Sequence, residues 1–345
     1  MSNQPHPPVY PQRNHYALTP TPLQPLNRLK ATLGLRARIW VKRDDLTGCH
    51  LSGNKIRKLE FLVAEAQAQG ADTLITCGGV QSNHARATAL LAAQEGMGCH
   101  LILRGDEPDQ ADGNLLLDHL AGAQVSFYPS HSFEANLTGY FEHWSNHYRQ
   151  QGNKAYGIPT GGSNGTGLWG YIACAEELGA QLRAQGIQPS RIVCATGSGG
   201  TQAGLTLGAA LCGLNAPVTG IAVCDDEAWF NRKVHEDWSS WQAQYAELAL
   251  KNCSAANLQL DQLNVHTLGQ YVGPGYARAD QDVFETIKLL ARTEGLLLDP
   301  VYTGKAFYGM LQELQRGAWQ DVDDILFVHT GGLFGVFPQR QEFVF

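Results

Sequence analysis

Residues 190–201 read SRIVCATGSGGT, an apolar run that ends in glycines and hydroxyl residues. The run Arg191–Cys194 predicts a buried strand, and a helix is expected from Thr201 onward. A strand that delivers such a loop to a helix N-terminus exposes free backbone N–H groups at the positive end of the helix dipole. This arrangement binds anions, phosphate above all, so the stretch predicts a phosphate site in an α/β fold.

Two common phosphate-binding motifs do not match this stretch. The Walker A pattern needs Gly-Lys-Ser or Gly-Lys-Thr, and no lysine follows the glycines here. The dinucleotide-binding pattern expects an acidic residue about 20 positions further on, whereas Asp225 lies beyond that spacing. A glycine-rich turn without a ligand remains the alternative for the stretch taken alone.

Short apolar strands alternate with helix-like segments on both sides of this stretch. Strands are expected at residues 71–79, 99–105, 124–129, 220–226 and 323–332. The alternation predicts βαβ units with parallel sheets, and no fixed period of 20–50 residues points to a solenoid. A length of 345 residues is sufficient for two such units.

Three further glycine clusters follow apolar runs, at Gly78-Gly79, Gly161-Gly162 and Gly331-Gly332. Open parallel sheets bind ligands at the carboxyl ends of their strands. The clusters therefore predict one extended crevice that holds a small polar molecule with a phosphate.

Composition excludes several classes of protein. The chain has 25 Lys and Arg against 32 Asp and Glu, a net charge of −7, which argues against nucleic acid or an anionic membrane as partner. The eight cysteines contain no C-x-x-C pair, so we expect reduced structural thiols and no metal site. The proline-rich N-terminus has no apolar signal region, and no run reaches the ~18 apolar residues of a membrane span. We expect a cytoplasmic protein.

A lysine near the N-terminal end of the chain adds a chemical group to the phosphate loop. Residues 52–60 read SGNKIRKLE and predict a helix start, with Ser52 or Asn54 as the N-cap. Lys55 would lie in the first turn, where the helix dipole and nearby cations lower its pKa and favour the neutral amine. Without further context a solvated surface lysine is the alternative. Beside a phosphate loop, the amine could instead form a Schiff base with a phosphorylated aldehyde.

Six motifs occur in one order between residues 21 and 337. They are Lys42–Asp45, Ser52–Glu60, Gly78–His84, Thr196–Thr201, Asp299–Lys305 and His329–Gly332. Together they resemble the fold-type II pyridoxal-phosphate enzymes of the D-cysteine desulfhydrase and 1-aminocyclopropane-1-carboxylate deaminase family. Residues 51–55, 223–226 and 332–335 are most similar to the desulfhydrases.

The resemblance implies a tryptophan synthase β-like α/β fold and the cofactor pyridoxal 5′-phosphate. Two three-layer α/β domains with mostly parallel sheets are expected, the small one inserted in the large one. Residues 1–52 and 162–345 would form the large cofactor-binding domain, and residues 53–161 the small domain that closes over the substrate. A homodimer is also implied.

Cofactor-binding roles are implied for residues that match the family motifs. Lys55 would hold the cofactor as a Schiff base and then move the proton at the substrate Cα. Asn83 would bind the cofactor's 3′-oxygen, and Thr330 would face the ring nitrogen. The phosphate would be held by Gly197, Ser198, Gly199, Gly200 and Thr201.

Substrate-binding roles are implied for two further groups of residues. Gln81, Ser82, Asn83 and His84 would hold the substrate carboxylate at a helix N-terminus, and Tyr276 and Tyr302 would contact the substrate. Ser82, Tyr276 and Tyr302 are the catalytic candidates beside Lys55, and which of them acts as acid or base stays open. The alternatives are ordinary: Ser82 and His84 could only cap the helix, and the tyrosines could be core residues. Arg57, Lys58 and Lys305 are interpreted as scaffold or surface cations.

One position bears on the reaction. The ring-opening deaminases of this family carry glutamate after the tyrosine, in DPVYEGK, where this chain has Thr303. Threonine hydroxyls at 303 and 330 would support a weaker electron sink, which suffices when a thiolate leaves Cβ. The sequence thus predicts a pyridoxal-phosphate-dependent carbon–sulfur lyase, by α,β-elimination on a small D-amino acid: D-cysteine would give pyruvate, hydrogen sulfide and ammonia. A ring-opening deaminase and a catalytically weak binding protein are the alternatives.

Overall fold

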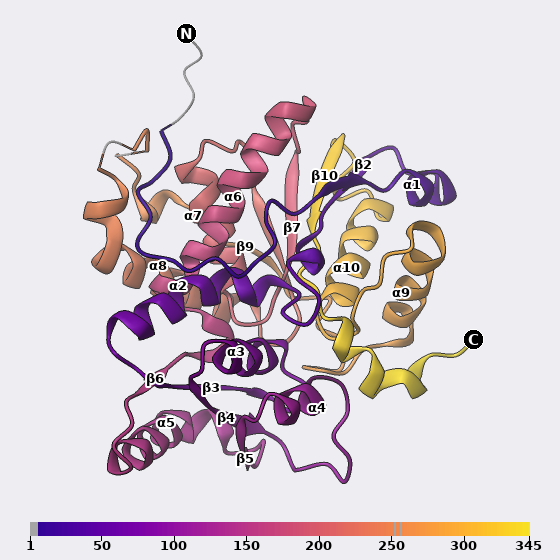
Figure 1. Ribbon diagram of the computed structural model, residues 1–345. Helices are drawn as coiled ribbons and strands as arrows, with labels where there is room; N and C mark the ends of the chain where they lie inside the picture. The colour runs from indigo at the N-terminus through magenta and orange to yellow at the C-terminus, as the bar shows by residue number, and fades with distance from the viewer. Residues whose placement is uncertain (1–5, 252, 256) are drawn as a thin grey trace.

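Two β-sheets, each with helices on both faces, form the described part of the chain, residues 6–251, 253–255 and 257–345 of a computed structural model (Figure 1). The larger sheet has the order β1-β2-β10-β7-β8-β9, and only β1 runs antiparallel. Its strands are β1 (Leu23–Pro25), β2 (Arg38–Lys42), β7 (Arg191–Thr196), β8 (Val218–Ala222), β9 (His266–Leu268) and β10 (Asp324–Val328).

The smaller sheet is fully parallel and has the order β5-β4-β3-β6. Its strands are β3 (Thr73–Gly79), β4 (Gly98–Arg104), β5 (Gln124–Tyr128) and β6 (Ala155–Gly157). The helices are α1 (Asn27–Leu33), α2 (Asn54–Ala68), α3 (Asn83–Gln94), α4 (Gly113–Leu120), α5 (Phe133–Gln150), α6 (Gly165–Gln185), α7 (Gly200–Leu211), α8 (Glu227–Ala249), α9 (Gln281–Glu294) and α10 (Thr303–Gln315). Helices α1, α5, α8 and α10 were not among the elements expected from the sequence.

Alternation along β7 builds the three layers of the larger sheet. Val193 and Ala195 pack in the core that α9 and α10 cover, whereas Ile192 and Cys194 pack in the core beneath α6 and α7. Apolar residues on both faces are what a parallel strand buried between helices requires.

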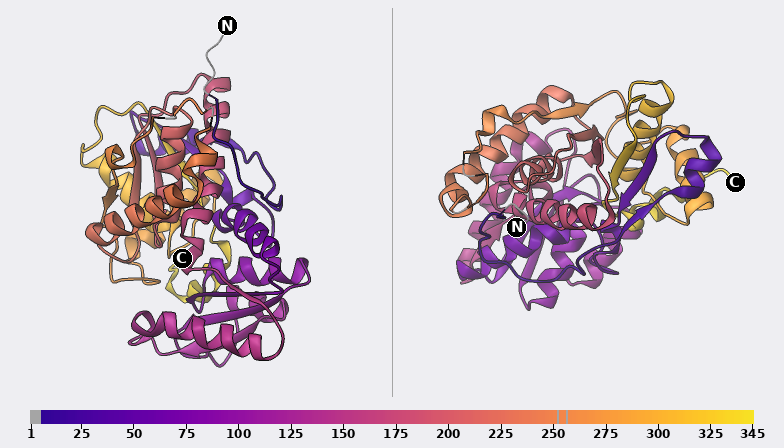
Figure 2. Two further views of the ribbon diagram at one scale, coloured as in Figure 1. Left: turned by 90° about the vertical axis from the view of Figure 1, so that its left-hand side faces the viewer. Right: turned by 90° about the horizontal axis from the view of Figure 1, so that it is seen from above.

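The smaller sheet is layered in the same way. Leu74 and Leu101 face the core formed with α2 and α3, and Ile75 and Ile102 face α5. Figure 2 shows helices on both faces of this sheet. These arrangements confirm the predicted fold class of two three-layer units with mostly parallel sheets. The division of the chain at residues 52 and 161 stays a prediction.

Helix α2 begins differently from the sequence-based prediction. Its N-cap is Gly53, with φ of 108°, and neither Ser52 nor Asn54 caps it. A Cβ at Gly53 would lie 2.7 Å from the carbonyl oxygen of Thr330, and the Asn54 N–H donates to that same oxygen at 3.1 Å. Only glycine permits this contact, which places the first turn of α2 beside the loop that follows β10.

A buried charge network fixes α2 from its other side. The Arg57 guanidinium donates to both oxygens of Asp44, from Nε at 2.9 Å and from Nη2 at 2.8 Å. The Tyr171 hydroxyl of α6 also donates to Asp44, and Arg57 Nη1 donates to Glu177 at 3.0 Å. Burial alone would raise the pKa of Asp44, but Arg57 holds it below its usual value. Arg57 is therefore a buried scaffold residue.

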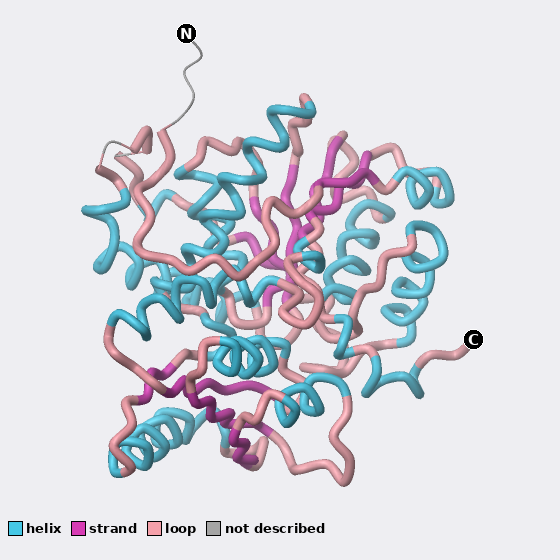
Figure 3. Tube along the Cα trace, viewed as in Figure 1, coloured by secondary structure: helices cyan, strands magenta, loops and turns pink. Residues whose placement is uncertain are grey.

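The N-terminal arm crosses the helices as a loop (Figure 3). The Val9 N–H donates to the carbonyl of Ala249 at the end of α8, and the Asn14 N–H donates to that of Glu60 in α2. Among the described residues, no helix is both long enough and apolar enough to cross a membrane. The eight cysteines, all described, are free thiols.

Candidate active site

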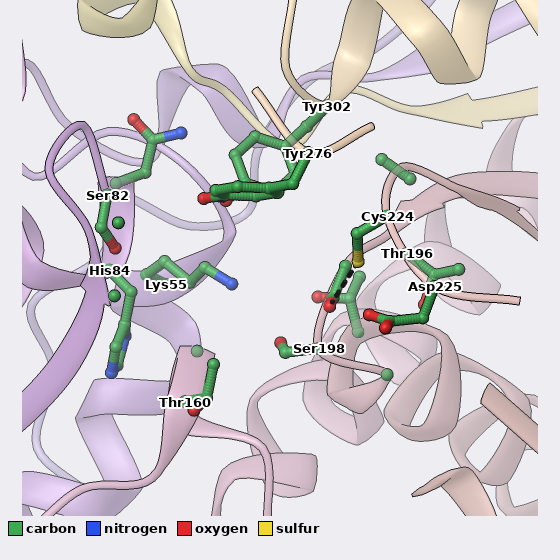
Figure 4. Close-up of a pocket in the computed structure, with 18 of the residues that line it drawn as sticks. Lys55, Ser82, His84, Thr160, Thr196, Ser198, Cys224, Asp225, Tyr276 and Tyr302 are labelled. Atoms are coloured by element: carbon green, nitrogen blue, oxygen red, sulfur yellow. Dashed lines mark hydrogen bonds between the residues drawn. The ribbon is translucent and has the colours of Figure 1, made fainter. Parts of the chain in front are cut away.

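A pocket of about 540 Å³ lies where the carboxyl ends of the two sheets meet (Figure 4). All four glycine clusters singled out in the sequence contribute to its lining, through Gly78, Gly79, Gly161, Gly197, Gly199 and Gly331. The expectation of one extended crevice at these strand ends is confirmed. Its volume lies within the usual range for small-molecule sites.

Most of the site residues expected from the sequence line this pocket. They are Lys55, Ser82, Asn83, His84, Gly197, Ser198, Gly199, Thr201, Tyr276, Tyr302 and Thr330. Gln81 and Gly200 lie outside the lining. The structure thus brings the candidates together, while their individual roles stay predictions.

Lys55 extends from the first turn of α2, and its amine points into the pocket (Figure 4). Burial lowers the pKa of Lys55 to about 8, so a fraction of the amine is neutral near pH 7. The space beside the amine depends on Gly161, whose φ is 64°. A Cβ there would lie 3.2 Å from Lys55 Nζ and 2.3 Å from Ser198 Oγ.

The glycine loop after β7 presents hydroxyl groups and a helix N-terminus. The Thr201 hydroxyl accepts a hydrogen bond from Asn54 Nδ2 at 2.9 Å, which leaves its own proton free. The Thr196 hydroxyl is buried in the lining without a partner in the described part of the chain. Helix α7 starts at Gly200, so its dipole adds a partial positive charge to the same loop.

A hydrogen-bonded chain behind the loop orients the Ser198 hydroxyl. Ser163 Oγ accepts from the Gly200 N–H and from Lys58 Nζ, both at 3.2 Å. Its single proton is therefore donated to Ser198 Oγ, 2.8 Å away, and Ser198 keeps its own proton for the pocket. Lys58 is fully buried, and burial lowers its pKa well below the ordinary value, so it is a scaffold residue and not a surface cation.

His84 has a defined tautomer. The Thr76 hydroxyl donates to the Ile158 carbonyl at 2.9 Å, so it must accept from His84 Nε2, also at 2.9 Å. Burial lowers the pKa of His84 well below its ordinary value, which leaves the ring neutral and Nδ1 an acceptor. The imidazole therefore offers no donor to a substrate carboxylate, so the predicted contact of His84 with that group would need its backbone N–H, at the start of α3.

Ser82 and Gln81 differ in where their side chains point. Ser82 is the N-cap of α3, and its Oγ accepts from the Ala85 N–H at 3.1 Å while still lining the pocket. Gln81 instead accepts from the Asn114 N–H and donates to the Asp112 carbonyl, both at 2.9 Å. Its side chain therefore binds the start of α4 and lies outside the pocket.

The two predicted tyrosines form a pair above the Lys55 amine (Figure 4). Their hydroxyl oxygens lie 2.6 Å apart, and the rings meet edge to face with centroids separated by 6.0 Å. Burial raises the pKa of both Tyr276 and Tyr302, so both hydroxyls are protonated near neutral pH. The Arg104 guanidinium lies 5.0 Å from the centre of the Tyr276 ring.

Thr303 is placed differently from the expectation. It is buried and does not line the pocket, and its hydroxyl donates to Asp299 Oδ1 at 2.7 Å. The Thr303 hydroxyl therefore does not face a bound ligand, because it belongs to the cap of α10.

Several lining residues were missed by sequence reasoning. They are Cys77, Arg104, Phe133, Glu134, Thr160, Cys224, Asp225, Trp229 and Lys233. Trp229 and Lys233 come from helix α8, which was not predicted. Arg104 is the last residue of β4 and Cys224 follows β8, so these strand ends could have drawn attention to them.

Comparisons with known proteins agree with this geometry. Residues 15–331 match the family described as "Pyridoxal-phosphate dependent enzyme". A bifunctional D-cysteine desulfhydrase/1-aminocyclopropane-1-carboxylate deaminase of Arabidopsis thaliana is 41% identical over 337 residues, which cover 94% of this chain and 79% of that protein. A D-cysteine desulfhydrase of Serratia proteamaculans is 38% identical over 329 residues, covering 92% and 94%. The crystal structure of an ACC deaminase homologue superposes with a TM-score of 0.83 at 34% identity, covering 97% and 95%.

Proposed function

The chain belongs to the pyridoxal-phosphate-dependent enzyme family, and from this premise we propose that it catalyses α,β-elimination on a small D-amino acid. D-cysteine and water would give pyruvate, hydrogen sulfide and ammonia. The observation that carries the proposal is the Lys55 amine, which lies in one pocket with the glycine loop and the tyrosine pair. The activities named for the relatives from Arabidopsis and Serratia support the choice of substrate.

The described residues fit pyridoxal phosphate. The free protons of Ser198 and Thr201, the unpartnered Thr196 hydroxyl and the N-terminus of α7 suit a phosphate group. Residues 197–201 would hold this phosphate. The space that Gly161 leaves beside Lys55 Nζ suits an aldehyde carbon that reacts with the amine.

Two further side chains would orient the cofactor ring. Asn83 would contact its 3′-oxygen, and Thr330 its ring nitrogen. When bound, pyridoxal phosphate supplies the electron sink that stabilises negative charge at the substrate Cα.

The protein contributes a base and a carboxylate site. Lys55 would take the proton from the substrate Cα, a role that its lowered pKa favours. The backbone N–H groups of Asn83 and His84, at the positive end of α3, would bind the substrate carboxylate. Lys55 and the two backbone N–H groups act at the same carbon, the Cα, so together they select a substrate that is an α-amino acid.

The tyrosine pair would act at the departing group. As the Cβ–S bond breaks, its electron pair goes to sulfur, which must be protonated to leave as hydrogen sulfide. Tyr276 and Tyr302 share a short hydrogen bond and are both protonated, so one hydroxyl can donate while the other replaces the proton. Hydrolysis of the remaining three-carbon fragment yields pyruvate and ammonia.

Ring opening of 1-aminocyclopropane-1-carboxylate is the second candidate. The likeness to the ACC deaminase homologue favours it, and the same lysine and tyrosines would serve. Thr303 cannot decide between the two reactions by contact with the ligand, because its hydroxyl is bonded to Asp299. The preference for D-cysteine therefore rests on the relatives whose names include desulfhydrase activity.

A comparative assay tests the proposal. The purified protein, loaded with pyridoxal phosphate, is incubated with D-cysteine, L-cysteine or 1-aminocyclopropane-1-carboxylate, and 2-oxo acid, sulfide and ammonia are measured. We expect equal amounts of pyruvate and sulfide from D-cysteine. Turnover of the cyclopropane compound alone would establish the second candidate, and no turnover of any substrate would indicate a binding protein.

A further inference from the structure

Asn114, at the start of α4, is fully buried and lies outside the pocket lining. Its side-chain amide Nδ2 donates two hydrogen bonds, to the Gln81 carbonyl at 3.0 Å and to Asn83 Oδ1 at 3.1 Å. Asn83 does line the pocket. Asn114 therefore contacts the site only through the loop that carries Asn83.

The Gln81 carbonyl fixes the orientation of both amides. A backbone carbonyl only accepts hydrogen bonds, so the Asn114 atom that faces it must be the nitrogen. The second proton of that nitrogen points to Asn83, so the Asn83 atom that receives it must be the oxygen. Turning the Asn114 amide around would place its Oδ1 against the Gln81 carbonyl oxygen. In the observed orientation, Asn114 Oδ1 has no hydrogen-bond partner in the described structure.

We propose that Asn114 is a positioning residue that holds the Asn83 amide with Nδ2 toward the pocket. Asn83 then offers an N–H donor, and never its oxygen, to the bound group. The proposal rests on the assignment of this pocket to the cofactor. There the recognised chemistry is an anionic ring oxygen, which a neutral N–H donor stabilises and an amide oxygen would repel.

Gln81 holds Asn114 in place. Its side chain accepts from the Asn114 backbone N–H and donates to the Asp112 carbonyl, so α4 cannot shift without breaking these bonds. The segment after β10 packs closely against the start of α4 as well, since a Cβ at Gly113 would lie 2.6 Å from the Phe334 carbonyl oxygen. This gives Gln81 a function outside the pocket that sequence reasoning did not find.

The test replaces Asn114 with aspartate, whose carboxylate accepts but does not donate. In N114D, Asn83 Oδ1 loses the hydrogen bond that Asn114 donates to it, and the Asn83 side-chain nitrogen is drawn toward the new carboxylate. We expect the visible absorbance maximum of the bound cofactor to shift, and the dissociation constant measured by titrating apoprotein with pyridoxal phosphate to rise about tenfold or more. Asn114→Ala, which removes the donor without adding charge, should give a smaller change of the same kind.

The same substitutions in an Asn83→Ala background separate positioning from general damage. If Asn114 acts through Asn83, N114D leaves the absorbance and the dissociation constant of that background unchanged. Equal changes in both backgrounds, or no effect of Asn83→Ala itself, would overturn the proposal. The matched control is Asn136→Asp, because Asn136 is exposed on α5 and also donates Nδ2 to a backbone carbonyl. Should N114D not fold, Asn114→Ala carries the comparison.

These readouts are independent of turnover. If the wild-type protein releases no pyruvate from D-cysteine while the two asparagines remain coupled, the proposed reaction fails and the positioning role stands.

Discussion

Lys55 owes its lowered pKa to burial. Sequence reasoning attributed the effect to the helix dipole and nearby cations, whereas loss of solvation is the cause found in the structure. Burial disfavours the ammonium form because the charge loses water, and within the described part of the chain no carboxylate compensates for this loss. The Lys55 amine is therefore partly neutral near physiological pH because the pocket as a whole buries it, and not because of one neighbouring group.

The pH dependence of cofactor capture tests this reactivity. The neutral amine is the nucleophile, and below its pKa the neutral fraction falls tenfold per pH unit. The rate at which apoprotein takes up pyridoxal phosphate should rise with pH and reach half of its maximum near pH 8, instead of near the ordinary 10.5. Stopped-flow absorbance from pH 6 to 10 measures this rate.

Two variants control that experiment. Lys55→Ala should lower turnover by at least about 10³-fold and abolish the pH-dependent absorbance change. Lys154→Ala, at an exposed lysine, should leave the profile unchanged. A rate that keeps rising above pH 9 would contradict the predicted pKa.

At the scale of one element, the start of α10 depends on a single carboxylate. Asp299 is buried and accepts hydrogen bonds from the backbone N–H groups of Val301, Tyr302 and Thr303, at 2.8–2.9 Å. These are among the N–H groups that a helix start leaves without an internal partner. The same cap fixes the backbone of Tyr302 and so the position of the tyrosine pair.

Removing this cap should destabilise the protein and impair the site. Asp299→Ala leaves the buried N–H groups unpaired, and we expect a loss of about 2 kcal/mol or more in the free energy of unfolding. Asp299→Asn retains one acceptor oxygen and should lose less. Urea unfolding measures both, and Asp321→Ala, at an exposed aspartate, should change it by less than about 0.5 kcal/mol. An equal loss at positions 299 and 321 would refute the capping role.

Element patterns explain which parts of the site were predictable. Parallel strands end at one edge of a sheet, so the glycines after β7 and β10 had to gather at one edge of the larger sheet. The glycines that end β3 belong to the smaller sheet, and they line the same pocket because of how the two sheets pack together. The directions of Gln81 and Thr303 depend on α4 and on Asp299, which are distant in the sequence or fixed by local backbone geometry. A motif predicts the loop but not which of its side chains face the ligand.

At the scale of the whole molecule, α2 joins the two sheets. Leu59 belongs to the core beside the smaller sheet, whereas Phe61 packs beneath α6 and α8. Arg57 anchors the helix to Asp44, which follows β2 of the larger sheet. Lys55 is therefore held by both halves of the structure.

Breaking the Asp44–Arg57 ion pair should destabilise the folded protein at neutral pH. Asp44→Asn removes the fully buried one of the two carboxylates that pair with the Arg57 guanidinium, and we expect the free energy of unfolding to fall by about 3 kcal/mol or more. The control is Asp323→Asn, since Asp323 pairs with Arg36 at the surface, where an ion pair contributes about 0–1 kcal/mol. Urea unfolding at pH 7 compares the two variants.

Acid should affect the wild-type protein more than the Asp44 variant. The pKa of Asp44 is lower in the folded state than in the unfolded chain, where it is near 3.8. Its stabilisation is thus present above about pH 4 and is lost as the pH falls through the folded-state value. Equal acid sensitivity of wild type and Asp44→Asn would exclude this linkage.

The layered fold could be predicted from the sequence because its signals are local. Strand–glycine–helix alternation fixes parallel sheets whatever their relative placement. Helix α8 was missed because the information that identifies it is its packing against α6 and α7. Gly53 was missed as the N-cap of α2 because glycine is required there by a contact with Thr330, which is far along the chain. Features set by long-range contacts are those that a single sequence conceals.

The position of β10 has a consequence for biosynthesis. This strand is made last, yet it lies between β2 and β7 in the larger sheet. All strands of the smaller sheet have been synthesised once residue 157 is added, whereas the larger sheet lacks β10 until residue 328 is added. We expect the smaller sheet to acquire structure during synthesis and the pocket to form only after residues 324–331 have left the ribosome, since Thr330 and Gly331 line it and follow β10.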